Sequence, residues 1–341
     1  MKVLVTANEV PYISGGAEFH VENLVANLKK KGIQASALKF PFNAGSANAI
    51  ESMMEYCQNY NCEHLNGIKI DKVISLQFPV YGVQHSNHSI WVMHQHRAVY
   101  ELYDENRATP ADKSLKNSVE KFDAQVLGEK DSLFANSCRV AERLKTYNGL
   151  TAEPLYHPPN NADQFFSAES WDYIFYPSRL ESLKRQELLI RAAAHLTTPV
   201  KILIAGDGSL RDYYARLIRE LNLDERVVLL GRITEAEKLT CYAHSLGVFF
   251  GPFDEDYGYI TLESMLSGKP VITCTDSGGP LEFVRHDENG FVVEPEPEQV
   301  AEKIDWLWLN KHKSEEMGRE GLAGYHKANI AWDNVLERLL D

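Results

Sequence analysis

The fold of this 341-residue chain is decided by residues 173–205, which read YIFYPSRLESLKRQELLIRAAAHLTTPVKILIA. Residues 173–176 and 200–205 are apolar runs of strand length, and residues 184–195 between them repeat apolar positions at helical spacing. The alternation continues, with strands predicted at 227–230, 247–250 and 271–274 and helices at 210–221, 235–243 and 260–267. Strict alternation of strands and helices predicts a parallel sheet with helices on both faces.

The first half of the chain shows the same alternation. Strands are predicted at 2–7, 33–40, 73–78, 90–94 and 132–136, and a helix at 17–31. A linker is expected at 157–161, because its tandem prolines continue neither a helix nor a strand. We therefore expect an α/β protein with two Rossmann-like domains, residues 1–160 and 161–325, facing each other across a cleft. Helices are further expected at 298–310, 314–323 and 332–340.

Charge and composition exclude several classes of protein. The net charge is −13, from 35 Lys+Arg against 48 Asp+Glu, whereas a nucleic-acid binder needs a basic face. No apolar stretch approaches the roughly 18–20 residues that span a bilayer, and the N-terminal residues lack the pattern of a signal peptide. Five scattered cysteines fit a reducing cytoplasm, so we expect a cytoplasmic protein. Lys29–Lys31 suggest peripheral contact with the inner, anionic membrane surface, or are simply solvated.

Two cations follow the first strand of the second half. In a doubly wound sheet, ligands bind at the carboxyl ends of the strands, so the loops after strands are the places to search. Arg179 leaves the strand end, and Lys184 is expected to open the next helix. An Arg fork and a Lys point charge suit a diphosphate, although solvated surface cations would give the same pattern.

An acidic loop with a glycine turn follows the strand at 247–250. Glu255 lies on the loop and Glu263 in the first turns of the next helix. On one continuous helix they would be about 12 Å apart, whereas a turn at Gly258 allows both to face one cleft. Backbone N–H groups of Tyr259, Ile260 and Thr261 would meet phosphate, and a carboxylate would accept hydrogen bonds from sugar hydroxyls. The alternative, an acidic turn that stabilises the helix dipole, leaves Glu263 unexplained.

Weaker glycine signals lie in three other loops. Gly15 and Gly16 suit an anion at a helix N-terminus, or a turn of positive φ. Residues 206–208 (Gly-Asp-Gly) are interpreted mainly as a structural turn, and residues 231–233 could present backbone groups to a flat base. No G-x-G-x-x-G sequence occurs here, which argues against NAD binding.

Taken in order, these residues resemble the retaining, GT-B-type nucleotide-sugar glycosyltransferases of family 4, the glycosyl transferases group 1. The resemblance covers nearly the whole chain and is densest over residues 173–293. The matching set is Gly15-Gly16-Ala17-Glu18, Arg179 with Lys184, Gly206-Asp207-Gly208, Gly231-Arg232, Glu255-x7-Glu263, Gly268-x-Pro270, Gly278-Gly279-Pro280-x-Glu282 and Asn289-Gly290. One departure is Ser178, where many relatives have glycine.

The resemblance implies that residues 161–325 bind the nucleotide sugar, that residues 1–160 bind the acceptor, and that a last helix within 326–341 crosses back to the first domain. It implies four catalytic residues: Glu255 near the reacting carbon, His94 near the donor sugar, and Arg179 and Lys184 on the diphosphate. Further donor contacts would come from Gly15, Gly16, Gly231, Arg232, Ile233, Gly258, Tyr259, Ile260, Thr261 and Glu263, the last on the ribose.

His96 and Arg97 are weaker candidates. His96 is the alternative to His94 for the contact near the donor sugar. His96 and Arg97 are also assigned to acceptor binding, where Arg97 would bind an anionic acceptor or form a structural ion pair. The histidines at 85, 88, 94 and 96 leave two further interpretations open, a metal cluster or ordinary half-buried side chains.

The expected function is transfer of a hexose from a UDP- or GDP-sugar to a hydroxyl of a growing polysaccharide or lipid-linked glycan. The resemblance implies retention of the anomeric configuration. Cations at the diphosphate remove the need for a divalent metal, so no metal or other cofactor is expected. The alternatives are a nucleotide-sugar epimerase or hydrolase on the same fold, and a non-catalytic subunit that binds nucleotide sugars.

Overall fold

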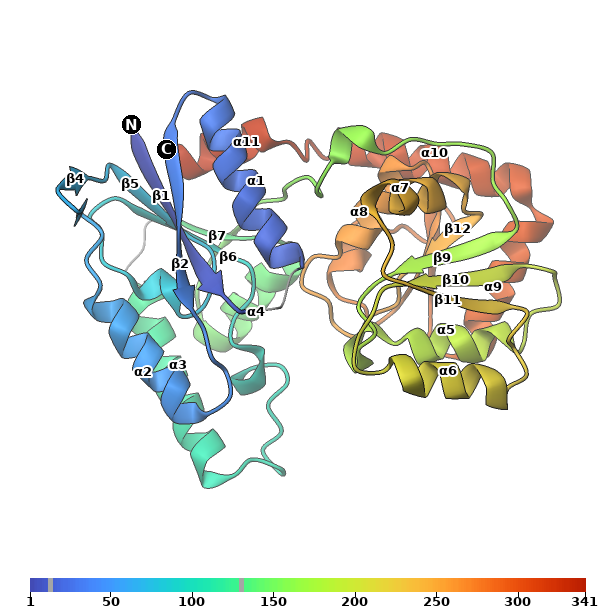
Figure 1. The fold of residues 1–341 in the computed structure, drawn as a ribbon, viewed down its shortest axis with the longest axis horizontal. Coiled ribbons are helices and arrows are strands. Elements are labelled where there is room, and N and C mark those ends of the chain that lie inside the picture. The colour runs from blue at the N-terminus through green and yellow to red at the C-terminus, as the bar shows by residue number, and fades with distance from the viewer. Residues whose placement is uncertain (12–14, 129–131) are drawn as a thin grey trace. The chain divides into compact units, whose positions relative to one another are not determined.

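The computed structural model describes residues 1–11, 15–128 and 132–341, which form two compact units. Unit 1 consists of residues 1–160 and 331–341, and unit 2 consists of residues 161–330. Each unit contains one six-stranded sheet whose neighbouring strands are all parallel (Figure 1). The prediction of two Rossmann-like parallel sheets is therefore confirmed.

The sheet of unit 1 has the strand order β2-β1-β5-β6-β7-β8. Its strands are β1 (Lys2–Glu9), β2 (Gln34–Pro41), β5 (Lys72–Ser75), β6 (His88–Val92), β7 (Leu133–Ala135) and β8 (Glu153–Pro154). The helices of unit 1 are α1 (Gly16–Lys30), α2 (Ala47–Asn59), α3 (Pro110–Gly128), α4 (Cys138–Asn148) and α11 (Trp332–Leu340). A small antiparallel pair, β3 (His64–Leu65) and β4 (Ile68–Lys69), lies outside the main sheet.

The pleat of strand β6 shows how both faces of this sheet are covered. Ile90 and Val92 belong to one apolar cluster, together with residues of α2, α3 and α4. Trp91, between them in sequence, belongs to a second cluster with residues of α1 and α11. Successive side chains of a strand point to opposite faces, so a continuous apolar run is what a strand buried on both faces requires.

The sheet of unit 2 has the strand order β11-β10-β9-β12-β13-β14. Its strands are β9 (Tyr173–Pro177), β10 (Lys201–Ala205), β11 (Val227–Gly231), β12 (Gly247–Phe249), β13 (Val271–Cys274) and β14 (Gly290–Val293). Its helices are α5 (Gln186–Ala193), α6 (Arg211–Glu220), α7 (Glu235–His244), α8 (Tyr259–Leu266), α9 (Pro297–Leu309) and α10 (Lys311–Lys327). None of the helices within the described ranges is long and apolar enough to cross a bilayer.

Several sequence expectations need correction. The helix expected from residue 184 begins at Gln186, because Arg185 has a φ of 52° and interrupts the helical geometry. The helix expected at 314–323 is longer and spans Lys311–Lys327. Helices α2, α3 and α4 and strand β14 were not predicted. Helices α3 and α4 are mostly polar, with few buried apolar residues on each, and tertiary packing supplies most of the stability of such helices.

Candidate active site

The candidate site lies in unit 2, where the strand order reverses. The chain runs from β9 outward through β10 to β11 and then returns to form β12 on the other side of β9. The loops that follow β9 and β12 therefore leave neighbouring strands on their way to opposite sides of the sheet. Such a switch point is where ligands bind in open parallel sheets.

Lys184 and Glu255 meet at this switch point. Lys184 ends a 3-10 turn (Ser182–Lys184), and the hydroxyl of Tyr176 on β9 donates a hydrogen bond to its carbonyl oxygen. Its Nζ lies 2.6 Å from Oε2 of Glu255, and the two side chains are only 17% and 21% exposed. The structure thus brings together two of the predicted catalytic residues as a largely buried ion pair.

Arg179 lies on the same loop and is more exposed. Its side chain is 54% exposed, and Nη1 lies 3.1 Å from Oε1 of Glu181. The turn around it packs against residues 206–208 so closely that a Cβ on Gly206 would lie 2.0 Å from the carbonyl oxygen of Ser178. Glycine is required at this position, which also has a φ of 127°. The close packing of Gly206 fits the interpretation of residues 206–208 as mainly a structural turn.

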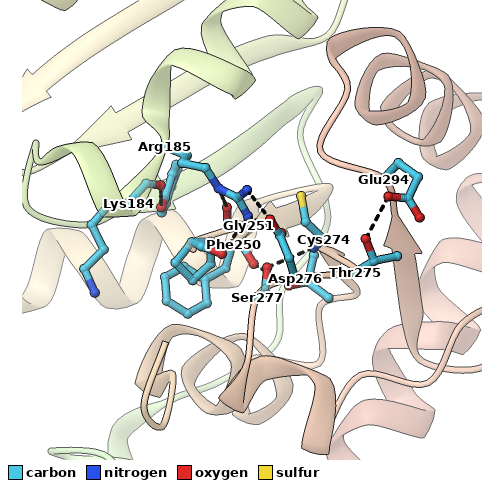
Figure 2. Close-up of polar contacts among 12 residues, drawn as sticks. Lys184, Arg185, Phe250, Gly251, Cys274, Thr275, Asp276, Ser277 and Glu294 are labelled. Carbon is cyan, nitrogen blue, oxygen red and sulfur yellow. Dashed lines mark hydrogen bonds and ion pairs between the residues drawn. The ribbon is translucent and has the colours of Figure 1, made fainter. Parts of the chain in front are cut away.

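Arg185 and Asp276 form part of the site that sequence reasoning missed. The guanidinium of Arg185 donates to both carboxylate oxygens of Asp276 at 2.9 and 2.6 Å, and to the carbonyl oxygens of Gly251 and Pro252 at 2.8 and 2.7 Å (Figure 2). Arg185 thus joins the loops after β9, β12 and β13. The only sign of this contact in the sequence was that a second cation, Arg185, directly follows Lys184.

The backbone of Glu255 is fixed by the loop after β13. The N–H of Glu255 donates to the carbonyl oxygen of Ser277 at 2.9 Å, and the N–H of Gly279 donates to the carbonyl oxygen of Glu255 at 2.8 Å. Gly278 has a φ of 73°, and a Cβ there would lie 2.5 Å from the carbonyl oxygen of Glu255. Gly278 and Gly279 therefore let the loop after β13 pack directly against the loop that carries Glu255.

Glu263 is held rigidly on α8. Its two carboxylate oxygens accept hydrogen bonds from the Tyr242 hydroxyl at 2.6 Å and from Lys238 Nζ at 3.0 Å. Burial and the neighbouring Glu263 raise the pKa of Tyr242 well above its usual value. Burial disfavours the charge of Lys238, but the carboxylates of Glu263 and Glu235 outweigh it, and the pKa of Lys238 is raised. A carboxylate accepts more than one bond per oxygen, so this one retains capacity for sugar hydroxyls.

Helix α8 begins directly after Gly258, whose φ is 88°. A Cβ at this glycine would lie 3.0 Å from Cγ of Pro280, so the turn is tightly packed as well as left-handed. The hydroxyl of Thr261 is buried and has no hydrogen-bond partner in the part of the chain that the structure describes. Burial, and then Glu263, raise the pKa of Tyr259. Thr261, next to Ile260 in the first turn, is the residue of this segment best suited to accept a polar partner.

The segment at 231–233 follows β11. Gly231 has a φ of 70°, and the exposed Arg232 places Nε 3.5 Å from Oδ2 of Asp207. Ile233 packs at the edge of the apolar cluster that contains Tyr173. A contact of this backbone with a nucleotide base stays a prediction.

Unit 1 contains the remaining candidates. Gly15 has a φ of 179°, which is extended backbone, and Gly16 is the first residue of α1. The alternative of a positive-φ turn is therefore wrong for Gly15. Arg97 places Nε 2.5 Å from Oε1 of Glu101, which also lies 3.3 Å from Nη1 of Arg143. The ion-pair alternative for Arg97 is thus present in the structure.

The histidines at 85, 88, 94 and 96 have different partners. Nδ1 of His85 lies 2.8 Å from the carbonyl oxygen of Asn87. Nδ1 of His94 lies 2.8 Å from the carbonyl oxygen of Gln95, and His96 stacks on Phe78 with ring centroids 5.1 Å apart. Burial, and then His94, lower the pKa of His96. Nε2 of His88 lies 2.7 Å from the Ser75 hydroxyl. Over residues 1–11, 15–128 and 132–341, no group of three or more His, Cys, Asp or Glu could hold a metal ion.

The two Rossmann-like sheets define a protein of the GT-B fold class. Residues 159–323, which are 165 of the 341 residues, match the family of glycosyl transferases group 1. It is 27% identical, over 76% of its length, to the poly(ribitol-phosphate) alpha-N-acetylglucosaminyltransferase of Staphylococcus aureus. That match covers 50% of the relative, so the chain spans about half the length of the curated relative it matches.

Solved structures agree on the fold along the whole chain. Sucrose-phosphate synthase from Thermosynechococcus elongatus has a TM-score of 0.79 at 16% identity and matches 100% of this chain and 97% of its own. HepE from Anabaena, in complex with UDP and glucose, has a TM-score of 0.70 at 17% identity, with coverages of 100% and 98%. At this level of identity the likeness establishes the fold.

Proposed function

We propose that this chain transfers a hexosyl group from a UDP- or GDP-sugar to a hydroxyl of a growing polysaccharide or lipid-linked glycan, with retention of anomeric configuration. The observation that carries the proposal is the ion pair of Lys184 and Glu255, at 2.6 Å, at the switch point of a sheet within the segment that matches a glycosyltransferase family. HepE binds UDP and glucose on the same fold, and the Staphylococcus relative is a sugar transferase to a polyol phosphate. Both support a nucleotide-sugar donor and a hydroxyl acceptor.

In the proposed reaction, the bond between the anomeric carbon and the diphosphate oxygen breaks while a bond to the acceptor oxygen forms on the same face. The acceptor proton passes to the departing diphosphate. Lys184 and Arg179 stabilise the negative charge that develops on the leaving group, and Glu255 stabilises the positive charge on the sugar. Because protein cations serve the diphosphate, the proposed reaction needs no divalent metal. We place it in the cytoplasm, with the basic end of α1 near an anionic membrane surface; Lys31 is already paired with Asp333 at 2.9 Å.

The test is an assay of the purified chain with UDP- and GDP-linked hexoses, with and without acceptors. The acceptor panel contains alkyl glycosides, glycerol phosphate and polyprenyl-diphosphate-linked sugars, and NMR reads the product's anomeric configuration. Acceptor-dependent release of nucleoside diphosphate that survives EDTA is expected. Free sugar or an epimer from the donor alone would instead indicate a hydrolase or epimerase, and calorimetric nucleotide binding without turnover would indicate a non-catalytic subunit.

A further inference from the structure

Arg185 occupies a backbone conformation that ordinarily suits glycine. Its φ is 52° and its ψ is 41°, in the left-handed region, which is unfavourable for a residue with a side chain. The residue also separates two helical segments, the 3-10 turn that ends at Lys184 and helix α5 that begins at Gln186. A costly conformation persists when the side chain makes contacts that outweigh it.

Those contacts form a tether between three loops. Four hydrogen bonds lead from the guanidinium to Asp276 and to the carbonyl oxygens of Gly251 and Pro252, both of which are buried residues. Gly251 and Pro252 begin the loop that carries Glu255, and Asp276 lies on the loop that hydrogen-bonds the backbone of Glu255. Arg185 therefore binds the loop of Glu255 directly, through Gly251 and Pro252, and indirectly, through Asp276 on the loop after β13.

The left-handed turn also sends the two adjacent cations in different directions. Figure 2 shows the side chain of Lys184 leaving the chain away from the guanidinium of Arg185, which points toward Asp276. Lys184 and Arg185 each have a carboxylate partner, Glu255 at 2.6 Å and Asp276 at 2.6 Å. The charge of Arg185 is consequently neutralised by Asp276, whereas Lys184 lies beside Glu255, the carboxylate predicted to lie near the reacting carbon.

We infer that Arg185 is a positioning residue, which fixes the loop of Lys184 against the loop of Glu255 so that the two side chains meet in one geometry. This inference rests on the proposed function for its kinetic consequence. The link between the loops themselves is a property of the chain that can be measured without turnover. The two loops are also joined by the Lys184–Glu255 pair, by Lys184 Nζ over the ring of Phe250 at 6.0 Å, and by a hydrogen bond from the N–H of Phe253 to the carbonyl oxygen of Leu183 at 2.8 Å.

The main variant is Arg185→Gly, because glycine adopts the left-handed conformation without strain and lets the chain fold. We expect backbone amides of residues 253–258 to exchange hydrogen at least tenfold faster than in the wild type. The matched control is Arg191→Ala, which removes an arginine paired with Glu187 on α5 and leaves that exchange unchanged. Unchanged exchange in Arg185→Gly would overturn the inference, even for a protein that transfers no sugar.

Steady-state kinetics distinguish an effect of Arg185 on the position of the loops from an effect of its charge. We expect Arg185→Gly to lower kcat at least tenfold while KM for the donor changes less than threefold. Arg185→Gly with Asp276→Asn removes the unpaired carboxylate as well, and we expect the same loss of kcat. Recovery of wild-type kcat in this double variant would show a purely electrostatic effect and overturn the inference, as would a kcat of Arg185→Gly within twofold of wild type.

A third comparison tests whether Arg185 acts through Glu255. In the Glu255→Gln background, we expect Arg185→Gly to reduce kcat less than a further twofold, because the geometry that it maintains no longer matters. A full additional tenfold loss would indicate independent damage to the fold and would count against the inference. If the wild type shows no turnover on any donor, the proposed function fails, and hydrogen exchange alone decides the role of Arg185.

Discussion

Lys184 and Glu255 are 71 positions apart in sequence, and each supplies the other's counter-ion. In the proposed reaction, Arg179 stabilises the charge of the diphosphate and Glu255 that of the sugar, and the transition state needs both more than the ground state does. We therefore expect Glu255→Gln and Arg179→Ala each to lower turnover more than tenfold. Steady-state rates of nucleoside diphosphate release measure this, with Arg191→Ala as the control for loss of an arginine elsewhere in unit 2. Rates within twofold of wild type for both variants would refute the assigned roles.

Glu181 competes for the guanidinium of Arg179, because its Oε1 lies 3.1 Å from Nη1. A phosphate that binds Arg179 has to displace this carboxylate. Exposed ion pairs contribute about 0.2–1 kcal/mol, so Glu181→Gln should tighten UDP binding by a factor between about 1.4 and 5. Calorimetric titration at low salt measures the change.

The control for this variant is Glu187→Gln, which loses a carboxylate paired with Arg191 on α5. Both substitutions change the net charge by the same amount, but only Glu181 contacts a predicted phosphate ligand. Equal tightening in the two variants would show that net charge alone is responsible.

Among the elements, α1, β6 and α11 meet at a buried aromatic cluster. His20 of α1 stacks on His157 with centroids 3.9 Å apart and contacts the edge of Trp91 at 4.2 Å, and Trp332 of α11 packs beside them. Burial lowers the pKa of His20 from 6.5 to about 3. Neither ring nitrogen of His20 has a hydrogen-bond partner among the described residues, so the folded state excludes its charged form.

This cluster predicts loss of stability in acid. Below pH 6.5 the unfolded state binds a proton at His20 that the folded state, with a pKa of about 3, does not bind. Stability therefore falls as the pH falls, by about 2 kcal/mol at pH 5.0, about 1.5 units below the unfolded pKa. Urea unfolding of wild type and His20→Leu at pH 7.5 and 5.0 measures it, since the free-energy difference between them should shift by about 2 kcal/mol.

The control for this experiment is His312→Leu, a histidine whose side chain is 81% exposed. Its stability relative to wild type should not change with pH by a comparable amount. Burial raises the pKa of Asp123 to about 6, so its contribution to stability increases as the pH falls. Asp123 is present in every variant, so this contribution cancels in the differences between variants. A pH-independent difference for His20→Leu would contradict the prediction.

Elements were predicted from sequence where their periodicity is strong. The strands flanking residues 184–195 and the final helix at 332–340 occur within one or two residues of their predicted positions. The start of α5 was misplaced because a left-handed residue is expected to be glycine, and Arg185 gives no local signal of that conformation. What stabilises it is a set of contacts with residues 66, 67 and 91 positions away.

At the scale of the whole molecule, the chain returns to its first unit after completing the second. Val335, Leu336 and Leu339 of α11 are buried in the cluster that contains Leu24 and Leu28 of α1. Burial of such a leucine stabilises a core, and Leu→Ala substitutions typically cost 2–5 kcal/mol. We expect Leu339→Ala to destabilise unit 1 by about that amount while unit 2 keeps its stability.

Hydrogen exchange resolved by segment measures this prediction, with α1 and β6 reporting on unit 1 and β9 and β12 on unit 2. Glu337→Ala, an exposed position on the same helix, is the matched control and should leave both units unchanged. Faster exchange confined to unit 2 in Leu339→Ala would contradict the assignment of α11.

The class of fold and the residue types of the site follow from local sequence patterns. Apolar runs alternating with amphipathic segments encode parallel sheets locally, and Arg179, Lys184, Glu255 and Glu263 stand out because each follows a strand. Which of these residues meet depends on the order of the strands in the sheet. β12 pairs with β9 rather than with β11, its predecessor along the chain, and this order brings Glu255 to Lys184 and Asp276 to Arg185. Strand order depends on packing between distant segments, so no local pattern of residues encodes it.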